Sequence, residues 1–279
     1  FLMHHITVEL ENRLPFFFFY FIANNKNLSD DLRESFYHNP DAIDEHNPNW
    51  HQWGIITHSE AFQEMFEREV IPYLKKWGQY DKVNHHLSKT IDGISKWNLF
   101  DMASPLHDLG KFDKGFKVME DGSVAFKFGG HEARSEEIIR EDWMHTLLTE
   151  LGLTDSQIDY IARLAGLHFE LGIIRNKAKK TEMGYTMAYA RSEFFLNAVV
   201  EELPKYYGFE VEVGLLFLTH SLAKTDVFLH AEDDEEIEMK SSKAMGEILQ
   251  RGLNRRLINA VKQNPVNTEI TRNYLELIL

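Results

Sequence analysis

Apolar residues recur at helical spacing along most of this chain. One face of a long amphipathic helix is indicated where they fall at i, i+4, i+8, i+11 and i+12, at Phe62, Phe66, Val70, Tyr73 and Leu74. Two lysines followed by Trp77 and Gly78 predict the end of that helix. Thr154 is the expected N-cap of a later helix. Further helices are predicted at about 132–151, 155–170, 186–203 and 211–230.

A short stretch of extended structure is expected in the middle of the chain. Asp121-Gly122-Ser123 has the composition of a turn, and Val124, Phe126 and Phe128 alternate after it. We therefore predict an all-α helical bundle with a short β-hairpin insertion near 117–128. No internal repeat or low-complexity linker is visible, which favours one domain. Its expected parts are an N-terminal extension over 1–50, a main domain over 51–235 and terminal helices that complete this domain over 236–279.

Composition narrows the class of partner. The 279 residues are 43% hydrophobic, which is enough for a sizeable core, and the net charge is −14 with a pI near 5.4. Such a surface repels a nucleic-acid backbone, so small phosphorylated substrates are favoured over nucleic acid. With no cysteine there are no thiolate ligands, which suits a cytoplasmic location and leaves the 14 histidines as the available nitrogen ligands.

The segment Phe16-Phe17-Phe18-Phe19-Tyr20-Phe21-Ile22 is the most apolar stretch of the chain. A membrane-spanning helix needs about 20 apolar residues, so no membrane span is expected here. A signal peptide is not expected either, because polar residues replace the small-residue cleavage site. The segment is predicted to be a buried strand or helix. The chain begins at Phe1 rather than at a methionine, and its oligomeric state is left open.

Histidines and aspartates occupy several inward-facing or helix-terminal positions. Asp226 shares an apolar helix face with Leu222, and His168 lies on a stripe with Leu164 and Ala165. Each alone has an ordinary interpretation as a capping, ion-paired or hydrogen-bonded core residue. Together they form a set of six nitrogen and oxygen ligands, enough for one or two divalent metal ions. This set consists of His58, His107, Asp108, His131, His168 and Asp226.

The order of these residues resembles the HD domain superfamily of metal-dependent phosphohydrolases. Three segments are similar in sequence to the HD domain of bacterial tRNA nucleotidyltransferases. They are His107-Asp108-Leu109-Gly110-Lys111, then Phe128-Gly129-Gly130-His131-Glu132 with Ser135, and then Leu167-His168. The likeness covers roughly 55–230, and no nucleotidyltransferase domain is visible. It implies an HD-domain helical bundle.

The resemblance also implies roles for individual residues. His107, Asp108 and Asp226 are expected to bind metal, with Asp108 bridging two ions if two are present. His131 and His168 match positions that hold a second ion or contact the scissile phosphate. Lys111 matches a lysine that reaches toward substrate phosphate, and Arg134 is a second candidate for that task.

The first ligand of the set has two candidate positions. His58 opens the long helix as the family's first histidine does, but its spacing to His107 is longer than is usual for the family. His85 and His86 lie at a more typical spacing, within a polar stretch that lacks an apolar stripe. His58 is the preferred interpretation.

The expected chemistry is hydrolysis of a phosphoester by metal-activated water, and the expected substrate is a small phosphorylated molecule of the nucleotide class. Imidazole and carboxylate ligands suit Mn, Fe, Ni, Zn, Co or Mg without selecting among them. Two alternatives stay open: a nuclease acting on single-stranded nucleic acid, as in related HD domains of CRISPR-associated proteins, and a metal-binding module without catalysis. A nuclease would need a basic groove, for which Arg251, Arg255, Arg256 and Lys262 are the candidates. Cations in 171–185 face either substrate phosphates or solvent.

Overall fold

The structure is a computed structural model. It describes residues 2–24, 30, 58, 62–114, 116–118, 124–126, 129–230 and 264–279. These residues fall into two compact units. The first contains residues 2–24, His58 and 85–168, and the second contains 62–84, 169–230 and 264–279. The division of the sequence at 51 and 236 stays a prediction.

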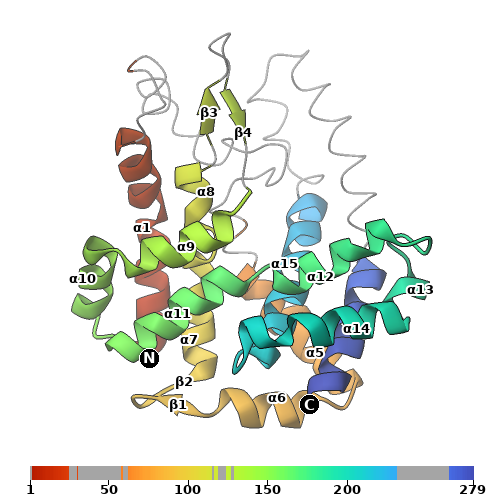
Figure 1. The fold of residues 1–279 in the computed structure, drawn as a ribbon. Coiled ribbons are helices and arrows are strands. Elements are labelled where there is room, and N and C mark those ends of the chain that lie inside the picture. Colours follow the sequence, from red (N-terminus) through yellow and green to blue (C-terminus); the bar gives the residue numbers. More distant parts are fainter. Residues whose placement is uncertain are drawn as a thin grey trace. The chain divides into compact units, whose positions relative to one another are not determined.

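The first unit is built on helix α1 (Leu2–Asn24). It packs on α7 (Lys96–Ala103), on the 3₁₀ turn η2 (Ser104–Leu106) and on α8 (Leu109–Lys114), as Figure 1 shows. The apolar segment near residue 16 therefore lies in a helix, and its Phe17 is fully buried. No helix in the described part of the chain has the length and apolar character needed to cross a membrane.

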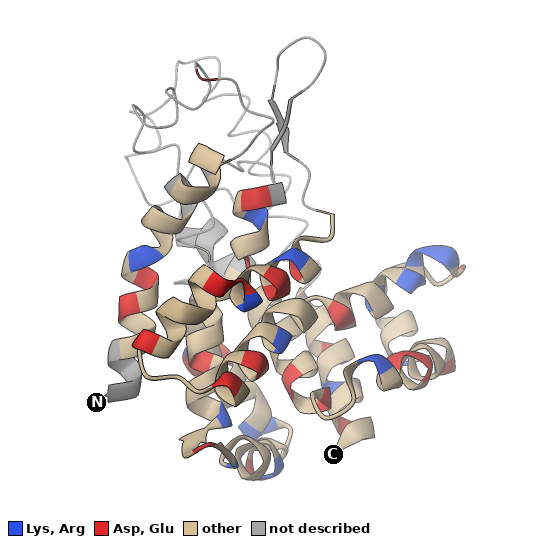
Figure 2. Ribbon diagram, turned by 60° about the vertical axis from the view of Figure 1, so that its left-hand side comes forward, with Lys and Arg blue, Asp and Glu red and all other residues tan. Residues whose placement is uncertain are grey.

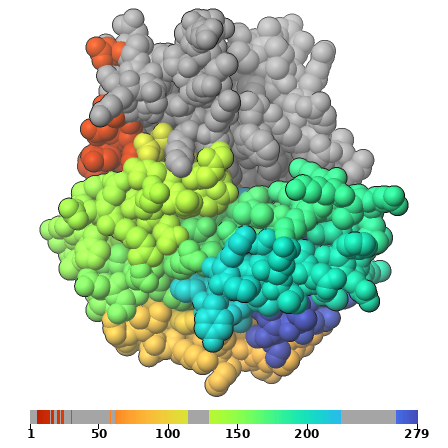
Figure 3. Space-filling view, viewed as in Figure 1, coloured from red at the N-terminus to blue at the C-terminus, as the bar shows by residue number. Residues whose placement is uncertain are grey.

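Three helices complete this unit and form much of its visible surface, yellow-green to green in Figure 3. They are α9 (His131–Arg140), α10 (Asp142–Glu150) and α11 (Asp155–Leu167). Helix α11 packs on both α9 and α7. Thr154 caps α11 in a full capping box with Gln157, so the predicted N-cap is confirmed.

The single helix predicted over 132–151 is wrong, because the chain breaks at Glu141. This residue has extended geometry, with ψ 143°, between α9 and α10. Its carboxylate accepts a hydrogen bond from the indole of Trp143 at 2.7 Å and pairs with Arg134 at 2.8 Å. The break turns the indole onto the rings of Phe17 and Tyr20, with centroids 5.8 and 4.8 Å away. Helical periodicity on both sides conceals such a one-residue interruption.

Two short antiparallel hairpins interrupt the helices of the described chain. Strands β3 (Phe116–Val118) and β4 (Val124–Phe126) form the predicted insertion. Strands β1 (Thr90–Ile91) and β2 (Ile94–Ser95) form a second hairpin, through the turn Asp92-Gly93. Both turn residues have positive φ, 47° and 88°, as a two-residue type I′ turn requires. The all-α class with a short hairpin is thus confirmed.

The second unit is also helical. The predicted apolar face from Phe62 to Leu74 is largely buried, and its helix stops before Gly78 with φ 69°, as expected. A π-helical turn interrupts it, and a further helix covers 264–278. The remaining elements are η1 (Phe66–Val70), α5 (Ile71–Lys76), α12 (Glu170–Asn176), η3 (Lys177–Lys180), α13 (Met187–Ala190), α14 (Glu193–Glu202), η4 (Leu203–Tyr206) and α15 (Glu210–His230).

The stretch expected to be a polar connection is a helix, α6 (Tyr80–Leu87), which has residues in both units. Val83 and Leu87, four residues apart, are fully buried and anchor it. Acidic and basic residues are interspersed along the helices of both units (Figure 2).

Candidate metal centre

Asp108 is the central residue of the candidate site. It lies in the turn between η2 and α8, where the chain leaves one helix and begins the next, and it is fully buried. A buried carboxylate is costly unless cations or hydrogen-bond donors surround it. The turn lets His107 and Asp108 point into the same interior region, which consecutive residues within one regular helix do less readily.

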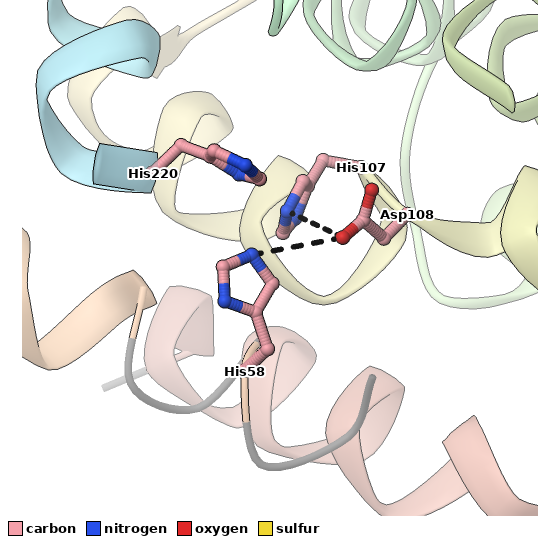
Figure 4. Close-up of side chains that lie close together, drawn as sticks. All are labelled: His58, His107, Asp108 and His220. Carbon is pink, nitrogen blue, oxygen red and sulfur yellow. Dashed lines mark ion pairs between the residues drawn. The ribbon is translucent and has the colours of Figure 1, made fainter. Parts of the chain in front are cut away.

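Each carboxylate oxygen of Asp108 faces two imidazoles. Oδ2 lies 3.3 Å from Nε2 of His107 and 3.6 Å from Nε2 of His58, as Figure 4 shows. On the other side, Oδ1 lies 3.2 Å from Nε2 of His131 and 3.4 Å from Nε2 of His168. Four histidines from distant parts of the sequence therefore converge on one carboxylate.

These residues form two groups that can hold a metal ion and that share Asp108. In the first unit, ligand atoms of His58, His107 and Asp108 all lie within 4.8 Å of one another, and so do those of Asp108, His131 and His168. Two ions bridged by one carboxylate, or a single ion on either side, both match this geometry. His220, also labelled in Figure 4, lies on α15 of the second unit.

Backbone carbonyls fix the orientation of two of the imidazoles. Nδ1 of His107 donates to the carbonyl of Ser104 at 2.5 Å, and Nδ1 of His168 donates to that of Ala165 at 2.7 Å. In the neutral form of either ring Nδ1 then carries the proton, and Nε2 of that form presents a lone pair to Asp108. Lone pairs of nitrogen and oxygen repel at such a distance, and a cation between them removes the repulsion. Metal-binding histidines are commonly oriented in this way.

Lys111 supplies the nearest fixed positive charge. Its Nζ lies 2.6 Å from Oδ2 of Asp108, and both side chains are buried. Burial alone raises the pKa of Asp108, but the charge of Lys111 and contacts from His107 and His131 outweigh it, so that pKa lies well below its usual range. Burial lowers the pKa of Lys111, and the attraction of Asp108 offsets this only in part. The carboxylate is therefore ionised at neutral pH.

His168 is fully buried on the stripe of α11 predicted from its apolar neighbours, at the residue that ends the helix. Burial lowers the pKa of its imidazole well below the ordinary value, and the neighbouring His107 and His131 lower it further against the opposing effect of Asp108. The ring is therefore neutral at pH 7, which is the form that binds metals.

A close approach of two helices holds the two sides of the centre together. Gly110 on α8 donates its backbone N–H to Oγ of Ser135 on α9 at 2.8 Å. A Cβ atom on Gly110 would overlap the backbone carbonyl of His131, at the start of α9. The glycine therefore permits the spacing at which His131 reaches the carboxylate that follows His107.

Arg134 and Asp226 are the predicted site residues that the structure does not place beside Asp108. The guanidinium of Arg134 pairs with Asp113 at 2.5 Å, Glu137 at 3.3 Å and Glu141 at 2.8 Å. Its predicted role toward substrate stays a prediction, as does that of Asp226, whose side chain lies outside the described residues.

Of the candidates for the first ligand, His58 is the one placed beside Asp108. His85 is exposed on α6, and His86 has its ring nitrogen 3.2 Å from the ammonium of Lys96. Metal binding by His58 itself remains to be tested. The basic residues considered for a nuclease groove, 251–262, lie outside the described residues.

Sequence reasoning did not assign roles to the residues that support the ligands. Ser104 and Ala165 act through backbone carbonyls, which leave no signature beyond their position three residues before a histidine. Glu132 approaches Nδ1 of His131 at 3.3 Å and is a second acidic neighbour of the centre. Its position directly after His131 was a visible signal.

The chain was compared with protein families, curated proteins and solved structures. No protein family model, no curated protein and no solved structure matches this chain.

Proposed function

We propose that this protein is a metal-dependent phosphohydrolase that cleaves a phosphoester of a small phosphorylated substrate, such as a nucleotide. The observation that supports the proposal most strongly is the ionised carboxylate of Asp108 with two imidazole nitrogens facing each oxygen at 3.2–3.6 Å. The resemblance of the ordered ligand set to HD domains and the acidic net charge of −14 agree with it.

The donor set fits divalent ions of borderline or hard character. His58 and His107 would hold an ion at Oδ2 of Asp108, and His131 and His168 would hold one at Oδ1. Such an ion supplies a water of lowered pKa, near 7 in favourable cases, and polarises the phosphoryl oxygens. In the net reaction a water oxygen bonds to phosphorus and the ester P–O bond breaks, so that the leaving alcohol takes a proton.

Lys111 has a defined part in this proposal. In the metal-free protein its ammonium balances the charge of Asp108 at 2.6 Å. With an ion held by His58, His107 and Asp108 that balance would no longer depend on Lys111, whose ammonium would be available to a phosphate oxygen. Loss of such a preorganised charge typically costs about a hundredfold in rate.

Turnover by metal-loaded protein tests the proposal. The chain is stripped with a chelator, reloaded with Mn, Co, Ni, Zn or Mg, and assayed on a generic phosphomonoester, a generic phosphodiester and single-stranded DNA. We expect activity on one of the two small esters and little on DNA. Asp108→Ala and the isosteric Asp108→Asn should lose both bound metal and turnover, by about a hundredfold or more.

A matched control is Asp159→Asn, an exposed aspartate on α11 paired with Arg140. It should retain full metal content and activity. Cleavage of single-stranded DNA in preference to both esters would instead establish the nuclease alternative. Stoichiometric metal with no turnover on any of the three would establish a non-catalytic metal-binding module. Full activity of Asp108→Asn would refute the site itself.

A further inference from the structure

A second polar site lies within the second unit, around Arg175 near the end of α12. Three aromatic rings surround its guanidinium, those of Phe169 at 5.6 Å, Tyr185 at 5.1 Å and Phe217 at 5.5 Å from the ring centroids. Cation–π contacts of this kind stabilise a cation that has lost part of its water. These three rings, called here the aromatic cage, satisfy none of the N–H donors of the guanidinium by an ordinary hydrogen bond.

No carboxylate in the described part of the chain forms an ion pair with Arg175. One terminal nitrogen donates to the amide oxygen of Asn176 at 3.1 Å, and Nε is buried with no hydrogen-bond acceptor. Lys177, two residues along, differs clearly, because Glu201 and Glu202 accept from its ammonium at 3.0 and 2.6 Å. A guanidinium has five N–H donors, so most of those on Arg175 are available.

A second buried group beside Arg175 is also unsatisfied. The hydroxyl of Tyr185 is buried beside the guanidinium of Arg175, and no acceptor for its proton lies in hydrogen-bonding geometry among the described residues. Burial raises the pKa of Tyr185, with Arg175 opposing the rise, so the hydroxyl keeps its proton and can donate it. Leaving buried donors unsatisfied is costly, and such groups commonly indicate a bound ligand or ion.

Packing within the second unit fixes the elements that carry the aromatic cage. The ring of Phe169 lies directly over Gly172, where a Cβ atom would approach to 2.7 Å. The hydroxyl of Tyr189 donates to the carbonyl of Ile174 at 3.1 Å, which ties α13 to α12. Exposed Lys179 and Lys180 follow in η3, so the segment after Arg175 carries positive charge in an otherwise acidic chain.

We infer that Arg175 and Tyr185 form a phosphate-binding site that is separate from the candidate metal centre. The guanidinium edge offers parallel N–H donors that match two phosphate oxygens, and the tyrosine hydroxyl offers a third donor. The inference does not depend on the proposed hydrolase activity, because it concerns binding and uses none of the metal ligands. The ligand is either free phosphate or the phosphate group of a nucleotide.

The sharpest test is Tyr185→Phe, which keeps the ring of the cage and removes only the hydroxyl. Binding of inorganic phosphate and of adenosine monophosphate to the full chain is measured by titration calorimetry, with chelator present so that no metal contributes. We expect tighter binding of one of the two, and about tenfold weaker binding of it by Tyr185→Phe. The thermal midpoint without ligand should change little, because the hydroxyl donates its proton to no described acceptor and its polar neighbour is Arg175.

Two further variants complete the test. Arg175→Gln should weaken the same ligand by about a hundredfold, since it removes the charge and the paired donors. Lys180→Gln removes an exposed cation of the same segment and should change affinity less than threefold. Binding of neither ligand by the wild-type chain, or equal affinities for the wild type and Tyr185→Phe, would overturn the inference and leave Arg175 as a packing residue. Preference for inorganic phosphate or for the nucleotide identifies the source of the phosphate.

Discussion

Asp108 combines two requirements that usually conflict, full burial and full ionisation. Lys111 and the surrounding imidazoles make this possible by lowering the pKa of the carboxyl group. The same surroundings make the centre sensitive to charge. Adding a proton to an imidazole or removing the lysine changes the net charge of the centre, where water does not screen the interaction between charges.

Acid should destabilise the metal-free protein through His168. Its pKa in the folded chain lies well below 6.5, so the unfolded state binds more protons once the pH falls below about 6.5. The free energy of unfolding should therefore decline by up to about 1.4 kcal/mol per pH unit over this range, until the pH reaches the folded pKa. Asp108 adds a similar loss only below about pH 3.9.

Urea unfolding in chelator at pH 7.5, 6.5 and 5.5 measures this dependence. His168→Gln should lower the slope, whereas His145→Ala, which alters a half-buried histidine of α10 beside Asp155, should leave most of it. An identical slope in the wild type and His168→Gln would show that another group is responsible.

Lys111→Met should destabilise the metal-free protein far more than the loaded one. The substitution leaves Asp108 buried without its nearest cation, which typically costs about 3–5 kcal/mol. A metal ion restores positive charge, so the deficit should shrink at saturating Mn. Urea unfolding with chelator and with Mn measures both values, and Lys89→Met, at an exposed lysine, is the control. Equal deficits in the two conditions would separate Lys111 from metal binding.

At the scale of elements, the approach of α8 to α9 sets the geometry of the centre. Gly110→Ala places a methyl group against the backbone carbonyl of His131, which can yield only if the helices separate. Overpacking of this kind costs about 1–3 kcal/mol, and the separation should also weaken metal binding.

Gly166→Ala is a matched comparison on α11. Its Cβ atom would meet the carboxylate end of Glu136, a flexible side chain paired with Arg140 and Arg163 at the surface. Loss of this ion pairing lowers the free energy of unfolding and the higher helix propensity of alanine raises it, each by about 1 kcal/mol or less, so the free energy of unfolding should change little. Thermal unfolding and Mn titration of both variants test the contrast; a larger loss for Gly166→Ala would contradict it.

Elements could be predicted from the sequence where one local signal determined them. The capping box at Thr154, the stop before Gly78 and the pairing of strands β3 and β4 are of this kind. The type I′ turn at Asp92-Gly93 has an equally clear local signal in its Asp-Gly pair, although the predicted elements do not include it. The break at Glu141 had none, because it depends on Trp143 contacting a helix far away in the sequence.

The candidate site shows the same limit. His168 and His131 could be placed by their helical positions, and the ordered set indicated that they belong together. Which oxygen of Asp108 each imidazole faces is a tertiary property, set by the packing of α8, α9 and α11. The ion pair between Lys111 and Asp108 is likewise a tertiary property. From the resemblance alone, Lys111 would be expected to point toward substrate phosphate instead.

At the scale of the whole molecule, a net charge of −14 attracts divalent cations generally, so binding must be separated from screening. A specific ion should raise the free energy of unfolding by about 2.7 kcal/mol when its concentration is a hundred times its Kd. Thermal unfolding with Mn at constant ionic strength measures this effect. Asp108→Asn should show no such rise, and a rise equal to that of the wild type would indicate diffuse surface binding.

The hydrogen bonds from His107 and His168 to backbone carbonyls have a calorimetric consequence. They hold the rings with Nε2 directed inward, and with Asp108 ionised these ligands are already in the state that a metal requires. At pH 8, above the ordinary imidazole range, these ligands should therefore release almost no protons on metal uptake, unlike many sites that must first be deprotonated. Any proton released would come from a water on the ion, whose pKa falls to near 7, so the dependence of the binding heat on the ionisation enthalpy of the buffer should correspond to no more than about one proton per ion.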